Sequence, residues 1–210
     1  MTFKALESPA DIEAAAGLLQ EIEPRFTKAI RQLEGIPLRR RAEGFDALLN
    51  AIVAQQVSVA SANAIWARLC AAGFDQEQKV LKASHDDLRN CGLSNQKAIY
   101  AVELARAGID WTGLSHVPDE EVIATLTKVK GIGRWTAEIY AMFSLGRTDV
   151  FAAGDLALQE AARILFELPE RPTEEDLRAM AGAWSPVRAV AARVLWAYYR
   201  VQKNREGITT

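Results

Sequence analysis

The chain has 210 residues, half of them hydrophobic, and a formal net charge of −2. This length and composition are enough to bury a hydrophobic core in one or two small domains. No segment approaches the roughly 20 consecutive apolar residues of a membrane span. The balanced charge excludes the strongly basic composition of many dedicated nucleic-acid binders.

The few cysteines and histidines exclude several kinds of site. Cys70 and Cys91 are the only cysteines, too few for a disulfide framework or for the four thiolates of an iron–sulfur cluster. His85 and His116 have no cysteine or histidine at ligand spacing, so a zinc site is not expected. Two isolated thiols are typical of a protein in a reducing cytoplasm, where we expect this chain to act.

Helices are predicted along almost the whole chain when its elements are taken in order. Ser8-Pro9 has the form of an N-cap followed by a first-turn proline, and it begins a helix that runs to about residue 19. A second helix is predicted over 24–34, a loop over 35–44 and a third helix over 45–53. A new helix begins at Ser58.

The C-terminal half of the chain continues in the same way. Ser84 and Thr173 each precede an aspartate by three residues, in the pattern of a helix-capping box. Val150-Phe151 is too short for a strand. The last helix has one apolar stripe, made of Val187, Val190, Ala191, Val194, Leu195 and Tyr198. We therefore predict an all-α protein of about ten helices.

A glycine pair joins two amphipathic helices in the middle of the chain. Apolar residues recur at helical spacing over 122–129 and again over 135–143, with Gly131-Ile132-Gly133 between them. Glycine permits a positive φ and leaves no side chain to obstruct a close approach. The N-terminus of the second helix offers free N–H groups to a phosphate. The segment from about 119 to 145 thus resembles a helix-hairpin-helix, which holds the DNA backbone without reading its sequence. An ordinary αα-hairpin would show the same glycines.

Several further segments carry a resemblance to a known family. They span roughly residues 45–199 in a fixed order, and they read Ala-Gln-Gln-Val-Ser-Val-Ala (54–60), Cys-Gly-Leu-Ser-Asn-Gln-Lys-Ala (91–98), Gly-Ile-Gly-Arg-Trp-Thr-Ala (131–137), Asp-Val-Phe-Ala-Ala-Gly-Asp-Leu (149–156) and Trp-Ser-Pro-Val-Arg (184–188). The chain resembles the helix-hairpin-helix DNA glycosylase superfamily. Within it, the Arg-Trp-Thr-Ala segment looks most like the 3-methyladenine DNA glycosylase II branch, which removes alkylated bases.

This resemblance implies an architecture and a partner. The expected architecture is a single glycosylase unit over residues 1–210, built as two helical subdomains that flank a DNA-binding cleft. The expected partner is double-stranded DNA with alkylated bases, bound by a monomer in the bacterial cytoplasm and nucleoid.

Asp155 is the candidate catalytic residue. Breaking an N-glycosidic bond builds positive charge on the sugar, and a nearby carboxylate stabilises that charge and orients or deprotonates the attacking water. From spacing alone, Asp155 can instead be the N-cap of a helix that begins at Leu156. The resemblance aligns it with the superfamily's catalytic aspartate. Gly154 departs from the family, because many relatives have a first aspartate there.

Trp135 predicts which type of glycosylase this is. In bifunctional relatives this position is a lysine, which forms a Schiff base and later nicks the strand. Because tryptophan has no amine, we expect a monofunctional enzyme that leaves an intact abasic site. The indole of Trp135, and by resemblance that of Trp184, would also face a positively charged purine such as 3-methyladenine or 7-methylguanine. Either tryptophan can instead be a core residue.

The remaining predicted site residues also follow from the resemblance. Gln55 and Gln56 lie where relatives place a loop residue that fills the gap left by an extruded base, although a plain helix–helix turn fits them too. The hairpin would bind DNA through Lys130, Gly131, Gly133, Arg134 and Thr136. The backbone carbonyls of Thr127, Val129 and Ile132 would hold a structural Na⁺ or K⁺ ion, and no cofactor is otherwise expected.

The sequence therefore supports two functions of different classes. One is a monofunctional DNA glycosylase that flips out and hydrolyses off alkylated purines in base excision repair. The other is a non-catalytic helix-hairpin-helix protein that binds damaged DNA or a DNA structure. Asp155 and the aromatic residues favour the enzyme, because binding alone needs neither.

Overall fold

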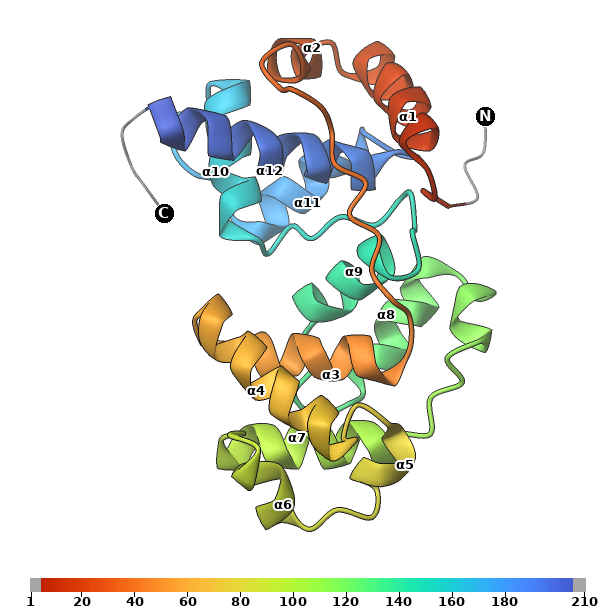
Figure 1. Cartoon of the computed structure of the whole chain (residues 1–210). Helices are drawn as coiled ribbons and strands as arrows, with labels where there is room; N and C mark the ends of the chain where they lie inside the picture. The colour runs from red at the N-terminus through yellow and green to blue at the C-terminus, as the bar shows by residue number, and fades with distance from the viewer. Residues whose placement is uncertain (1–4, 206–210) are drawn as a thin grey trace. The chain divides into compact units, whose positions relative to one another are not determined.

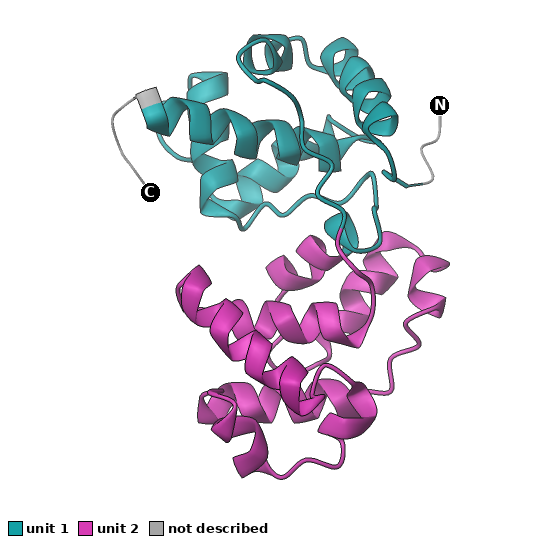
Figure 2. Ribbon diagram, viewed as in Figure 1, with its two compact units in different colours: residues 1–40, 141–210 teal, residues 41–140 magenta. Residues whose placement is uncertain are grey.

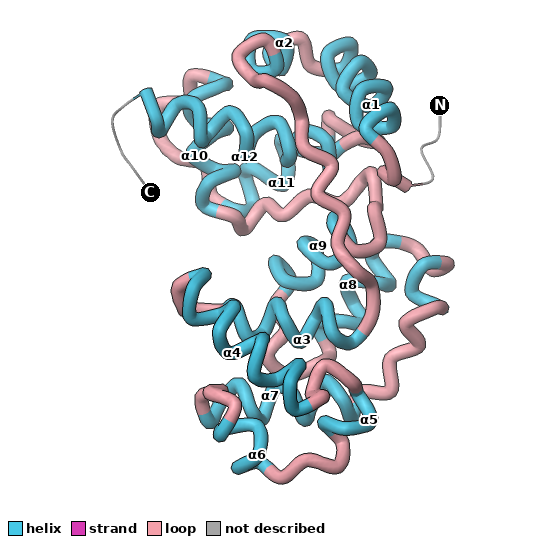
Figure 3. Tube along the Cα trace, in the orientation of Figure 1, coloured by secondary structure: helices cyan, strands magenta, loops and turns pink. Residues whose placement is uncertain are grey.

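The computed structural model describes residues 5–205, so residues 1–4 and 206–210 of the predicted unit lie outside the described residues. Over the described range the chain forms helices joined by loops and no strands (Figure 1, Figure 3). The prediction of an all-α protein is therefore confirmed. None of the helices in this range is both long and apolar enough to cross a membrane.

The chain divides into two compact units, as the prediction of two helical subdomains requires (Figure 2). Unit 1 is made of residues 1–40 and 141–210, and unit 2 of residues 41–140. Unit 2 is thus inserted in the sequence between the two parts of unit 1. The division falls inside one helix, α9 (Arg134–Phe143), between Tyr140 and Ala141.

Unit 1 is built around its last helix. Its helices are α1 (Pro9–Ile22), α2 (Arg25–Ile30), α10 (Leu156–Phe166), α11 (Glu174–Gly182) and α12 (Arg188–Arg205). Helix α12 packs against α1, α2 and α10 (Figure 1). The six residues of the predicted apolar stripe are all buried, none more than 3% exposed. Burial of this stripe is the main reason why α12 holds the unit together.

Trp184 lies at the centre of the aromatic core of unit 1. Its side chain is 2% exposed, and it is surrounded by the rings of Phe26, Phe151 and Phe166. The Trp184 ring stacks on Phe166 with centroids 5.5 Å apart and meets Phe26 edge-on at 5.1 Å. These arrangements are the favourable ones for aromatic pairs.

A buried arginine ties together the two parts of unit 1. Arg193 of α12 is 1% exposed and donates hydrogen bonds to the carbonyls of Leu38, at 3.3 Å, and Met142, at 2.9 Å. These acceptors lie just before and just after the inserted unit 2. Burial, together with the charges of Arg40 and Arg39, lowers the pKa of Arg193 to about 10. The guanidinium is therefore still charged at neutral pH.

Unit 2 is built around α3 (Phe45–Ala54) and α7 (Asn95–Arg106). Its other elements are α4 (Val59–Ala72), α5 (Glu77–Val80), α6 (His85–Asn90), the 3₁₀ helix η1 (Gly113–Ser115), α8 (Asp119–Thr127) and most of α9. Helix α3 packs against α4 and α7, and α7 also packs against α5 and α6. Leu48, Leu49, Ile52 and Val53 of α3 are fully buried and form the centre of this second core.

The observed helix boundaries agree with the predicted ones where the sequence has a capping motif, and differ from them where it has none. Ser8 is an N-cap, as predicted, and Ser84 and Thr173 have the predicted capping boxes; Ser8 has a complete capping box as well. The second helix ends at Ile30, earlier than expected, because the chain turns after it. The described residues form twelve α-helices against about ten predicted, since α5 and α6 are too short to show a clear periodicity.

The two tryptophans predicted to face the base should respond differently to truncation. Because Trp184 fills the aromatic core, Trp184→Ala should lower the free energy of unfolding by about 3–5 kcal/mol. The matched change Trp135→Ala removes a ring that is 45% exposed, and it should stay within about 0.5 kcal/mol of the unmodified chain. Denaturant unfolding followed by fluorescence measures both, and equal losses would show that Trp184 is not a core residue.

Candidate functional site

The predicted hairpin is present between α8 and α9. Val129 and Ile132 are buried, and the Ile132 N–H donates to the Val129 carbonyl at 3.0 Å. Ile132 thus anchors the turn in the core of unit 2, as predicted. Gly131 has a φ of +94°, and a Cβ at this position would collide with the ring of Tyr100. Only glycine fits there without strain.

Gly133 is not required by the packing of the chain itself. Its φ lies outside the left-handed region, and a Cβ built on it would meet nothing within 4 Å. It directly precedes α9, whose first-turn N–H groups have no acceptor within the helix and lie at the positive end of its dipole. A glycine here therefore leaves the helix N-terminus accessible to an anion.

The hairpin side chains predicted to bind DNA are not equally available. Lys130 is exposed. Arg134 is also exposed, but its guanidinium pairs with Glu138 at 2.9 Å and Glu120 at 3.6 Å. Thr136 is only 6% exposed, so its side chain faces the core and its backbone N–H is what it can offer.

Trp135 is the one exposed member of the predicted apolar stripe of α9. Ile139, Tyr140 and Phe143 on that stripe are at most 9% exposed, whereas Trp135 is 45% exposed. It lies one residue into α9, directly after the hairpin turn. A large aromatic ring held at the surface beside a helix N-terminus is well suited to contact a ligand.

The loop between α3 and α4 contains the two predicted glutamines and gives them different positions. The Gln55 side-chain amide donates to the Gly131 carbonyl at 3.1 Å, which joins this loop to the hairpin turn. Gln56 is exposed and has a φ of +54°, which is unusual for a residue with a side chain. The sequence grouped these residues, and the structure gives them different surroundings.

Of the residues whose carbonyls are predicted to hold a monovalent cation, Thr127 is the last residue of α8, whereas Val129 and Ile132 follow in the turn. The C-terminal end of a helix carries carbonyls without intrahelical partners and a negative partial charge. Thr127 and Ile132 line a surface groove of about 550 Å³ together with Gly133. Val129 does not line it, and its carbonyl accepts the hydrogen bond from Ile132. The cation site at Thr127, Val129 and Ile132 stays a prediction.

Asp155 is held by three hydrogen-bond donors. It is the N-cap of α10, where its Oδ1 accepts from the N–H groups of Ala157 at 2.9 Å and Leu158 at 3.1 Å. The third donor is the indole N–H of Trp196, at 3.1 Å from the same oxygen. The predicted cap is thus real, and it fixes the direction of the carboxylate.

Trp196 was missed by the sequence analysis. It lies on α12, beside the buried stripe rather than in it, and it is half-buried. Its ring contacts that of Phe143, with centroids 5.7 Å apart. Its distance of 41 residues from Asp155 gives no local signal. A polar-edged aromatic residue on the flank of an otherwise apolar helix was the only indication available.

The segment that leads to Asp155 is fastened at several points. Asp149 forms a two-pronged ion pair with Arg188, at 2.8 and 3.0 Å, and accepts from the Ser185 hydroxyl at 2.7 Å. These contacts join two of the segments that carry the family resemblance. Gly154 faces the Glu174 carboxylate, which would lie 3.0 Å from a Cβ at 154. An aspartate at 154, as in many relatives, would therefore meet a like charge.

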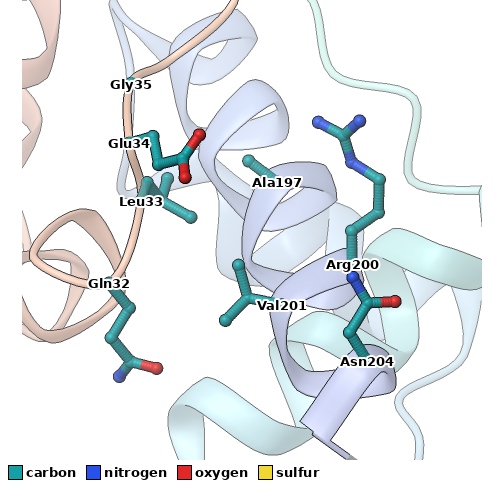
Figure 4. A pocket seen from close by; sticks show the side chains of 8 residues that line it. All are labelled: Gln32, Leu33, Glu34, Gly35, Ala197, Arg200, Val201 and Asn204. Carbon is teal, nitrogen blue, oxygen red and sulfur yellow. The ribbon is translucent and has the colours of Figure 1, made fainter. Parts of the chain in front are cut away.

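The structure removes Trp184 from the candidate base-binding residues. Its ring is enclosed by three phenylalanines and leaves no face for a base. A separate groove of about 400 Å³ does occur in unit 1, between the loop after α2 and the end of α12 (Figure 4). Glu34 and Arg200 line it, but Asp155 does not, so it is not part of this site.

Most of the chain, including the hairpin and Asp155, matches a known protein family. The family model described as HhH-GPD superfamily base excision DNA repair protein matches residues 49–186, which is well over half of the chain. The chain belongs to this superfamily. The matched region contains both the hairpin and Asp155.

Similar members of the superfamily are named as glycosylases. DNA-3-methyladenine glycosylase 1 of Schizosaccharomyces pombe is 31% identical over 189 residues, which cover 85% of this chain and 82% of that protein. The crystal structure of a DNA-3-methyladenine glycosidase from Bacillus halodurans is 31% identical, with a TM-score of 0.80 and coverage of 95% and 93%. A Schizosaccharomyces pombe 3-methyladenine DNA glycosylase in complex with abasic DNA is 30% identical, with a TM-score of 0.73 and coverage of 87% and 95%.

The two glycines of the hairpin should separate folding from DNA binding. Gly133→Ala should leave the unfolding temperature unchanged, because open space surrounds that position. It should weaken binding to damaged and undamaged duplexes alike by about tenfold, the cost of a charge-assisted hydrogen bond. Fluorescence anisotropy measures this, with Gly131→Ala as the variant expected to lose stability instead. A Gly133→Ala loss confined to damaged DNA would show that the hairpin does not clamp the backbone.

Proposed function

We propose that this chain is a monofunctional DNA glycosylase that excises alkylated purines, such as 3-methyladenine and 7-methylguanine, from duplex DNA by hydrolysis. The single observation that carries the proposal is the Asp155 carboxylate, held at the N-terminus of α10 by three donors to one oxygen. The names of the similar proteins support the same substrate class. We also propose that it acts as a monomer.

The chemistry assigned to Asp155 follows from charge. The bond between C1′ of the sugar and the base nitrogen breaks, and the base leaves with the electron pair. Positive charge then develops on the sugar, and a carboxylate whose direction is already fixed stabilises it without reorganisation. Water attacks C1′ and loses a proton, for which Asp155 is the base. The products are a free base and an abasic site.

Trp135 is the residue that we assign to the damaged base. Alkylation at N3 or N7 gives the purine a positive charge, and a cation over an indole face gains about 0.5–2 kcal/mol. The exposed ring can offer that face. Because an unmodified purine is neutral, this contact favours the damaged base over the normal one.

The hairpin and the loop after α3 are the parts that we assign to the DNA itself. The turn at Gly131-Ile132-Gly133 and Lys130 would hold the backbone, whereas Gln56 would enter the duplex and fill the gap left by the extruded base. A Na⁺ or K⁺ ion bound by the Thr127, Val129 and Ile132 carbonyls would add a positive charge beside the phosphate.

The absence of strand cleavage is part of this proposal and depends on one side chain. A glycosylase that nicks DNA through an imine needs an amine at C1′ of the sugar. The indole of Trp135 occupies the position of that amine and is not a nucleophile. Lys128 and Lys130 are the nearest amines in sequence, and they lie before the glycine turn. Water is then the remaining nucleophile.

Two assays on one substrate test the proposal. Duplex DNA methylated on its purines is incubated with the protein, and released bases are identified by chromatography. We expect free 3-methyladenine and 7-methylguanine, and intact strands until alkali is added. Borohydride, which traps an imine as a covalent adduct, should trap nothing. No released base at all would instead indicate a non-catalytic damage-binding protein, and a trapped adduct would show that a lysine reaches the sugar.

A further inference from the structure

The loop 55–58, between α3 and α4, is connected to two other elements of unit 2 through Gln55. We propose that Gln55 and Lys97 are positioning residues that fix this loop against the hairpin turn, so that Gln56 is presented at a set distance from the bound phosphate. This inference rests on the proposed function, in which Gln56 enters the duplex. It assigns roles to Gln55 and Lys97 that do not require either to touch DNA.

Lys97 holds the loop from the side of α7. Its ammonium group donates to the carbonyl of Val53, at 2.7 Å, and to that of Gln55, at 2.5 Å. Both acceptors lie at the C-terminal end of α3, where unpaired carbonyls and the negative end of the helix dipole favour a cation. Partial burial lowers the pKa of Lys97. A lysine withdrawn from water in this way is unavailable as a freely moving DNA contact.

Gln55 holds the same loop from the side of the hairpin. Its amide donates to the carbonyl of Gly131, the glycine that adopts a φ of +94° in the hairpin turn. The loop is therefore hydrogen-bonded to the turn that we assign to phosphate binding. Gln55 has little conformational freedom, because Lys97 binds its backbone carbonyl and the Gly131 carbonyl binds its side chain.

Helix α7 supports both ends of this connection. Lys97 reaches the loop, and Tyr100, three residues later, packs against Gly131 so closely that a Cβ there would collide with its ring. Residues three apart lie on the same face of a helix. One face of α7 therefore sets the position of the loop and of the hairpin turn together.

The conformation of Gln56 shows why such support is needed. Its φ of +54° is sparsely populated by residues other than glycine and persists only where the surroundings enforce it. Its side chain is exposed, as are Val57 at 40% and Val59 at 78%. An exposed strained residue that is followed by exposed apolar ones suits insertion among stacked bases. Without Lys97 and Gln55, the loop would relax and insertion would require it to be ordered again.

The proposal predicts a selective loss that a purely structural role would not give. Lys97→Met and Gln55→Leu should each reduce the preference for abasic-site duplex over undamaged duplex by about tenfold, the change expected when a hydrogen bond to a charged group is lost. Binding to undamaged duplex should stay within about twofold, because the backbone clamp is intact. The double variant should lose little more than either single one, since both act on one loop.

The experiment measures both affinities by anisotropy, and wedge insertion by the fluorescence of 2-aminopurine placed beside the abasic site. Insertion unstacks this base and raises its fluorescence, so Lys97→Met and Gln55→Leu should show a reduced rise. Lys82→Met, which removes the charge of an exposed lysine elsewhere in unit 2, is the matched control and should behave as the unmodified chain. If Lys97→Met does not unfold cooperatively, Gln55→Leu alone decides the test.

Gln56→Ala distinguishes failure of the inference from failure of the proposed function. If Gln56→Ala loses the fluorescence rise while Lys97→Met and Gln55→Leu keep it, Gln56 is the wedge and the positioning roles are overturned. An unchanged rise in Gln56→Ala overturns the wedge itself and with it this inference. An equal loss of affinity for both duplexes in Lys97→Met and Gln55→Leu shows a structural role only and also overturns it.

Discussion

The hydrogen bonds to one oxygen of Asp155 are the constraint on which the proposed chemistry depends. Two come from the first turn of α10 and one from Trp196 of α12. The two backbone donors and the indole together fix the direction of the carboxylate. The preceding segment is fastened by the ion pair between Asp149 and Arg188. Asp155 can therefore be both the N-cap and the proposed catalytic residue. The N–H groups of the first turn of α10 hold its carboxylate in a fixed direction, in which it could stabilise a positive charge.

The candidate site residues are distributed over the two units. Unit 1 contains Asp155 and the helices that hold it, whereas unit 2 contains the hairpin, the loop after α3 and Trp135. In unit 2, as at Asp155, side chains from elements distant in the sequence hold a functional segment in place. Gly131 is fitted against Tyr100, and Gln55 donates to the Gly131 carbonyl. Sequence-independent binding needs only a few local contacts with the DNA backbone and its phosphate charges. A chain of net charge −2 can therefore belong to a DNA repair family.

The sequence predicted those features of the structure that depend on interactions between residues close together in the chain. The serine and threonine caps, the glycine turn, the buried stripe of α12 and the position of Asp155 before a helix all depend on residues a few positions apart. Trp196 and the bond from Gln55 to Gly131 depend on contacts over 41 and 76 residues, for which a single sequence has no periodicity to read. Trp184 was misplaced for the same reason, since its burial is decided by Phe26, Phe151 and Phe166 rather than by its neighbours.

The most direct measurement is single-turnover release of 3-methyladenine by Asp155→Asn. Asparagine is as good an N-cap as aspartate, so the variant keeps α10 and removes only the negative charge. We expect base release to fall by about 100-fold or more, as when other preorganised electrostatic groups are removed. The unfolding temperature and the affinity for abasic-site DNA should remain those of the unmodified chain. Base release at a rate near that of the unmodified chain would show instead that Asp155 only caps the helix and that the chemistry lies elsewhere.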